Sequence, residues 1–158
     1  MLHIGAQITS TPTANQPTAQ YTYAFDSWSG VPAGGTVTQD VTITANFART
    51  VNQYTVTIES NNTEYGTVSP GSMRLPYGAI ITESATQPNV LMYIIQQPQI
   101  LAIATPNAST AQYTYAFDSW SGIPGSVTGD VTITANFTRD LMTYTVTFAV
   151  NNPEYGSV

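Results

Sequence analysis

The sequence of 158 residues contains neither cysteine nor lysine. Without cysteine, disulfides and thiolate metal sites are excluded. Without lysine, the Lys–Asn isopeptide cross-links that stiffen many surface proteins are also excluded, so the chain must resist unfolding through hydrogen-bonded strands and packing alone. The three basic residues are all arginines, and the net charge is −6. Nucleic acids and anionic membranes attract clustered cations, so we expect neither as a partner.

Charge of either sign is scarce, at 8% of residues against about 25% in ordinary globular domains. Thr, Ser, Asn and Gln provide the polar surface, which is common in extracellular β modules. The most apolar stretches, residues 90–95 and 100–104, are separated by Gln-Gln-Pro-Gln, whereas a spanning helix needs about 20 apolar residues. We therefore expect no membrane insertion within this chain. The first residues also lack the basic and apolar regions of a signal peptide, so the signal and anchor of a secreted parent would lie outside this sequence.

Groups suited to catalysis are few. The sole histidine is His3, and the remaining nucleophiles, Ser and Thr, lack a plausible base. The carboxylates Asp26, Asp40 and Glu64 are better explained as turn and loop residues. The same side chains and their repeat copies would also suit calcium, but no Asp-x-Asp-x-Asp spacing occurs. We predict a protein that is not an enzyme and has no cofactor, catalytic residue or structural metal.

Internal repetition is the main feature of the sequence. The ten residues Tyr-Thr-Tyr-Ala-Phe-Asp-Ser-Trp-Ser-Gly occur at 21–30 and again, unchanged, at 113–122. Val-Thr-Ile-Thr-Ala-Asn-Phe occurs at 41–47 and at 131–137, and Tyr-Thr-Val-Thr at 54–57 and at 144–147. Asn-Asn-Thr-Glu-Tyr-Gly at 61–66 returns at 151–156 with Pro153 in place of Thr63. The second copy is two residues shorter between 124 and 127, which marks an exposed loop.

These matches divide the chain into three parts. Residues 1–50 correspond to the C-terminal part of a repeat unit, residues 51–139 to one complete unit, and residues 140–158 to the start of a further unit. The sequence therefore has the form of a piece of a longer array.

The repeated segments have the pattern of β-strands. Val41, Ile43, Ala45 and Phe47 alternate with polar residues, and the segments at 21–26 and 54–59 alternate in the same way. We expect the apolar members to be mostly buried: Tyr23, Phe25, Trp28, Val41, Ile43, Phe47, Tyr54, Val56 and their copies. Turn residues separate the segments about every ten residues, which predicts an all-β fold of small tandem sheet modules. Residues 90–104 predict a further hairpin, and residues 80–87 would hold at most a short helix.

The order of these motifs resembles the Listeria–Bacteroides repeat family, most closely its divergent internalin-B-type B-repeats. The resemblance rests on an aromatic strand, Phe-Asp-x-Trp-Ser-Gly, a loop, Val-Thr-x-Asp-Val-Thr-Ile-Thr-Ala-Asn-Phe and then Tyr-Thr-Val-Thr, and it is best over residues 113–147. It implies tandem modules in long bacterial and archaeal surface proteins, described as adhesin stalks, some with a β-grasp-like fold. The alternative fold that the resemblance implies is therefore β-grasp-like α+β with one short helix. The segment at 79–104 is longer than in the family unit. The family has no catalytic residues to transfer.

Trp28 and Trp120 are the residues with two competing interpretations. With Tyr23 and Tyr115 they would form a platform on which a sugar ring stacks. Alternatively, each Trp fills the same hole in the core of each unit and its indole N–H bonds a loop carbonyl. We favour the core, since every unit of a stacked array must fill the same hole. Buried rings would support it, and exposed flat rings would support sugar binding.

The sequence therefore favours a non-catalytic structural stalk or spacer in a secreted or cell-surface adhesin. The alternative is a carbohydrate- or protein-binding β module with exposed aromatics and an unidentified host or surface glycan or protein as its ligand. The expected partners are neighbouring repeat units. A second copy of the chain is a further candidate, because residues 144–150 are apolar on one face and would pair with the unpaired edge of residues 1–50.

Overall fold

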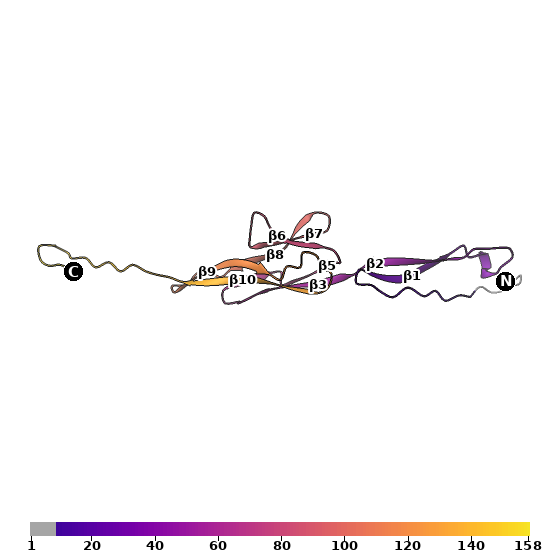
Figure 1. Cartoon of the computed structure of the whole chain (residues 1–158), viewed down its shortest axis with the longest axis horizontal. Coiled ribbons are helices and arrows are strands. Elements are labelled where there is room, and N and C mark those ends of the chain that lie inside the picture. The colour runs from indigo at the N-terminus through magenta and orange to yellow at the C-terminus, as the bar shows by residue number, and fades with distance from the viewer. Residues whose placement is uncertain (1–8) are drawn as a thin grey trace.

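The computed structural model describes residues 9–158, which form an elongated molecule with three parts in line (Figure 1). The first is an antiparallel hairpin of β1 (Tyr21–Ser29) and β2 (Thr44–Val51). The second, which we call the body, spans residues 53–141 and carries two four-stranded sheets. The third, which we call the tail, comprises residues 142–158 and has no strand.

The first sheet of the body has the order β5-β3-β10-β9, with a parallel pair at its centre. Val131 pairs with Val56 and Ile133 with Ile58, so the apolar members of both strands point to the same face. Antiparallel neighbours flank this pair on both sides. The strands are β3 (Gln53–Ser60), β5 (Ser72–Pro76), β9 (Tyr113–Ser121) and β10 (Val131–Leu141).

The second sheet is antiparallel throughout, in the order β4-β8-β7-β6. Its β7 and β8 confirm the hairpin expected over residues 90–104. The short helix considered for residues 80–87 is wrong: Ile80 to Glu83 form a strand, in line with the β preference of adjacent isoleucines. The strands are β4 (Gly66–Ser69), β6 (Ile80–Glu83), β7 (Val90–Ile94) and β8 (Pro98–Pro106).

The described part of the chain is all-β, as expected, and its one helical element is a 3₁₀ turn, η1 (Ala33–Gly35). The α+β alternative is therefore wrong for residues 9–158. No helix over these residues has the length and apolar character needed to cross a membrane.

A single apolar cluster joins the two sheets of the body. Val56, Ile133 and Leu75 come from the first sheet, and Leu91 and Leu101 from the second. Each of these side chains is fully buried, which stabilises the fold by about 1.5–3 kcal/mol per side chain. The body therefore has its own core.

The hairpin has no such core, although β1 and β2 repeat the sequences of β9 and β10. Trp28 is 36% exposed and its copy Trp120 only 7%; Phe47 is 47% exposed and its copy Phe137 only 3%. The expected burial of Phe25, Trp28, Val41 and Phe47 is therefore wrong. The physical reason is that, among residues 9–158, β2 pairs only with β1 and no second sheet covers the pair.

The lack of a partner equivalent to β3 also shortens β2. Residues 131–133 belong to β10 and pair with β3, whereas the identical residues 41–43 precede β2 and have no strand partner in the part of the chain that the structure describes. The tail shows the complementary case, because Val146 is 73% exposed while its copy Val56 is fully buried. Burial of Tyr144 and Val146 was therefore also wrongly expected.

Candidate functional site

The sequence suggested Trp28 and Tyr23 of the hairpin and Trp120 and Tyr115 of the body as residues on which a sugar would stack, and in the hairpin Trp28 lies in an aromatic cluster. Phe25 lies 5.5 Å from Trp28 and 5.9 Å from Phe47, measured between ring centroids. The copies in the body, Phe117 with Trp120 and Phe137, have separations of 5.4 and 5.9 Å. The exposed cluster therefore already has the geometry that its copy has when buried.

A bulge in the aromatic strand produces this arrangement. Pairing skips Asp26 between Phe25 and Ser27, and the skip is repeated at Asp118 in β9. The extra residue brings Phe25 and Trp28 onto the same face, although they are three positions apart. Ser27 Oγ donates to the Asp26 carboxylate at 2.9 Å, which holds the bulged carboxylate at the surface.

The two tryptophans differ in what covers them. Trp120 is 7% exposed and its Nε1 donates to the carbonyl of Pro88 at 3.0 Å, so a sugar could stack on this ring only if the core opened. No described residue takes that place over Trp28. The ring of Trp28 is accessible, and that of Trp120 has the geometry of a core residue.

The two tyrosines proposed as stacking partners differ in the same way. Tyr115 stacks on Tyr65 with 5.7 Å between centroids and 29° between planes. Its copy Tyr23 instead lines a pocket of about 170 Å³ together with Thr13, Asn15 and Phe47. Tyr23, Asn15 and Phe47 are the copies of Tyr115, Asn107 and Phe137, and in the body these three residues contact the segment 63–66 that contains Tyr65.

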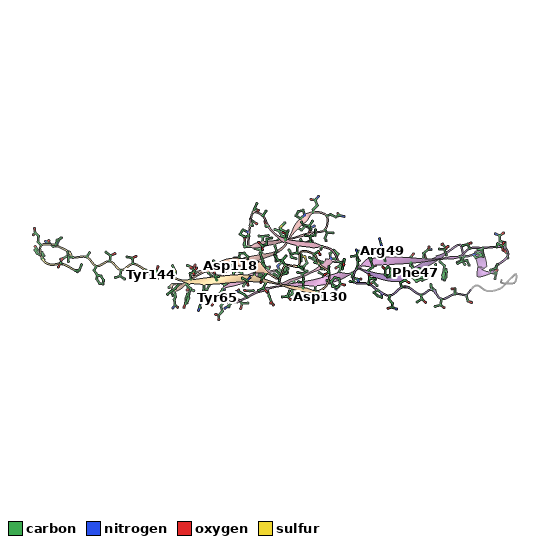
Figure 2. The ribbon with its side chains drawn as sticks, viewed as in Figure 1. Phe47, Arg49, Tyr65, Asp118, Asp130 and Tyr144 are labelled. Atoms are coloured by element: carbon green, nitrogen blue, oxygen red, sulfur yellow. The ribbon has the colours of Figure 1, made fainter. Side chains whose placement is uncertain are left out.

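An arginine lies against tyrosine rings in both the body and the hairpin. The guanidinium of Arg139 lies 4.5 Å from the Tyr113 ring and 5.2 Å from the Tyr65 ring. Its copy Arg49 lies 4.5 Å from Tyr21 alone. Figure 2 labels Tyr65 in the body and Phe47 and Arg49 on the hairpin.

The aspartates suggested for calcium have structural contacts. Asp118 accepts a bond from Ser119 Oγ at 2.8 Å, as Asp26 does from Ser27. Asp130 Oδ1 accepts the Thr55 N–H at 2.7 Å and so fixes the start of β3 against β10. Over residues 9–158, no three acidic or histidine side chains gather as metal ligands. His3 lies outside the described residues.

The same side-chain bond occurs at both ends of the body, once at each junction. Tyr54 Oη donates to the Ala19 carbonyl at 2.7 Å. At the junction between body and tail, Tyr144 Oη donates to the Ala111 carbonyl, also at 2.7 Å. The two tyrosines and the two alanines are repeat copies of each other.

Backbone bonds repeat the same relationship. The Asn52 N–H donates to the Gln20 carbonyl at 2.9 Å, and the Met142 N–H donates to the Gln112 carbonyl at 2.8 Å. The chain thus leaves the body in the same way that it enters it.

Sequence reasoning missed three residues that join the late strands to the early ones: Asn61, Gly66 and Asn107. Asn61 bonds the backbone of Phe137, and Asn107 Nδ2 donates to the carbonyls of Thr63 and Glu64 at 3.1 and 3.0 Å. Gly66 lies against the Phe137 ring. Their recurrence as Asn151, Gly156 and Asn15 was the available signal.

Comparison of the chain with protein-family models, with curated proteins and with solved structures finds no match.

Proposed function

We propose that this chain is a non-catalytic tandem-repeat module of a cell-surface or secreted protein, where it acts as an adhesin stalk or spacer. The observation that carries the proposal is the repeated junction. Tyr54 and Tyr144 make equivalent bonds to the preceding unit, and Asn52 and Met142 do the same through their backbone. Units joined in this way keep a constant orientation along an array.

The shape of the molecule supports this proposal. Hairpin, body and tail lie in one line (Figure 1), and the tail extends away from the hairpin. Polar junction bonds of fixed length oppose bending at each connection, while the apolar core keeps each unit folded. An array of such units would act as a stiff spacer that holds another domain away from its anchor.

The resemblance to the Listeria–Bacteroides repeats adds a second line of support. The motifs that carry this resemblance form adjacent strands of one sheet, because β9, β10 and β3 follow one another in the order β5-β3-β10-β9. The cover of this sheet is a second sheet and not a helix, so the support comes from the motifs and their pairing rather than from a β-grasp fold. The long segment at 79–104 supplies strands of this second sheet.

The alternative function is carbohydrate or protein binding through exposed aromatics, which the accessible rings of Phe25, Trp28 and Phe47 favour. The copies of these rings are mostly buried in the body with the same mutual geometry. A surface that is covered in the complete unit is better explained as part of a core than as a sugar platform. We therefore place the spacer function first.

Small-angle scattering on chains with one, two and three complete units tests the spacer function. We expect the maximum dimension to grow by a constant increment per unit. Tyr54→Phe, which removes a junction bond, should broaden the distribution of lengths. Tyr93→Phe is the matched control, because its hydroxyl bonds Gln99 within the body. Compact arrays, or arrays whose length grows as that of a flexible chain, would contradict the proposal.

Screening the chain of 158 residues, in which the Trp28 ring is accessible, against glycans tests the alternative. Binding that is lost in Trp28→Ala and retained in Tyr54→Phe would establish the sugar platform. No binding to any glycan is the result that the spacer function predicts.

A further inference from the structure

The tail and the hairpin are complementary parts of one unit. Residues 144–147 repeat the sequence of β3, and residues 41–47 repeat the part of β10 that receives β3. We propose that the hairpin of one copy of the chain binds the tail of a second copy as its missing parallel strand and turn. The partner is thus another molecule of the same chain, joined head to tail.

The body sets the register of this pairing. Val56 pairs with Val131 and Ile58 with Ile133, so Val146 would pair with Val41 and Phe148 with Ile43. These apolar side chains are exposed or half-buried in the single chain, and their burial drives association. The Asp40 carboxylate would accept the Thr145 N–H, as Asp130 accepts that of Thr55.

The turn at the end of the tail is already folded for binding. Asn152 Oδ1 accepts the Glu154 N–H at 2.9 Å, and the Asn152 carbonyl accepts the Tyr155 N–H at 3.1 Å. The copy in the body has the same two bonds, at 2.9 and 3.0 Å, centred on Asn62. Because this turn needs no further ordering, its binding loses less conformational entropy.

The turn would bind in the pocket beside Tyr23. In the body, Tyr65 stacks on Tyr115 and lies beside Arg139. Tyr23 and Arg49 are the copies of Tyr115 and Arg139, so Tyr155 of the tail would stack on Tyr23 and lie beside Arg49.

Two further contacts fix the turn in place. Asn15 would donate to the tail backbone as Asn107 does to residues 63 and 64. Gly156 would lie against the Phe47 ring as Gly66 lies against Phe137, where no side chain fits. In the single chain nothing lies within 4 Å of a Cβ built on Gly156.

The tail cannot reach the hairpin of its own chain. The two lie at opposite ends of the molecule with the body between them (Figure 2), and Tyr144 is bonded at the end of the body by Ala111. A contact between unlike surfaces at opposite ends extends a chain of molecules rather than closing a dimer. Over the residues that the structure describes, the composite unit has no copy of β5, β6 or β7, so we expect reversible association.

Sedimentation or light scattering of the full chain over a concentration series tests the proposal. The average mass should rise with concentration. Gly156→Val should raise the dissociation constant about tenfold or more through a clash with Phe47. Ser157→Val is the matched control, because its copy Thr67 is exposed in the body. Both variants should keep the melting temperature of the body, since the tail is not part of its core.

A wild-type chain that stays monomeric at every concentration would overturn the proposal. So would Gly156→Val associating as well as the wild type, or Ser157→Val losing association equally. Cross-linking tests the register independently, because the chain has no natural cysteine. Thr42→Cys and Thr147→Cys, mixed and oxidised, should form a disulfide between copies, since paired strands lie within disulfide reach. Thr42→Cys with Thr145→Cys is the off-register control, and equal yields from the two mixtures would refute the register.

Discussion

The side chain of Asn61 bonds both backbone groups of Phe137: its Oδ1 accepts the N–H at 2.9 Å, and its Nδ2 donates to the carbonyl at 3.2 Å. The Asn61 N–H also donates to the Ala135 carbonyl at 3.0 Å. β3 ends at Ser60, so these bonds continue its pairing with β10 beyond the last residue of the strand. One asparagine thereby ties the first strand of the body to its last.

Asn61→Ala should lower the free energy of unfolding of the body by about 1–3 kcal/mol, because partly buried backbone groups of Phe137 lose their partners. Urea denaturation of the monomer measures the change. Asn151→Ala is the matched control, since Asn151 lies in the tail and should change the stability by less than about 0.5 kcal/mol. Equal effects of the two substitutions would contradict the assigned role.

Phe137→Ala should cost about 3–5 kcal/mol, as large aromatic truncations in cores do. Phe47→Ala removes the same side chain from the same local sequence, but on a surface that is half open. Its effect on the unfolding of the body should stay within about 0.5 kcal/mol. A loss that small for Phe137→Ala itself would mean that the inward face of β10 is misassigned.

Gly66→Ala should destabilise the body by about 1–3 kcal/mol, because the new methyl group would overlap the ring of Phe137. Gly129→Ala provides the comparison. Nothing lies within 4 Å of a Cβ at Gly129, and the first repeat has Gln39 at the same position. Thermal unfolding of both variants measures the difference, and a stable Gly66→Ala would show that Phe137 is free to move aside.

Removal of divalent metal should leave the melting temperature unchanged. Asp26 and Asp118 accept bonds from neighbouring serines, and Asp130 accepts a backbone N–H, so each carboxylate has a structural use without calcium. Calorimetry with a chelator and with added calcium measures this. A clear fall in melting temperature with the chelator, restored by calcium, would establish a calcium site.

The sequence predicted the strands well where alternation was strong, as in β3, β9 and β10. It predicted burial less well, because alternation says which face is apolar but not whether anything covers it. Residues 41–47 and 131–137 are identical, yet Phe47 is exposed and Phe137 is buried. The difference arises from β3 and from the second sheet, which are contacts distant in sequence.

The joining residues were missed for a related reason. Asn61 and Asn107 act on backbone groups of distant segments, so no local pattern marks them. Gly66 has ordinary backbone angles and is required by contact with Phe137 rather than by the turn. Only their recurrence in the repeat distinguishes Asn61, Gly66 and Asn107 from other residues between the strands.

The sequence shared by residues 41–47 and 131–137 takes two states, according to whether the early strand lies beside it. Amide hydrogen exchange on the dilute, monomeric chain compares these states, because the two segments have the same intrinsic rates. We expect strong protection over 131–135, where β3 pairs, and exchange close to that of a free peptide over 41–43. Equal protection of the two segments would contradict this expectation.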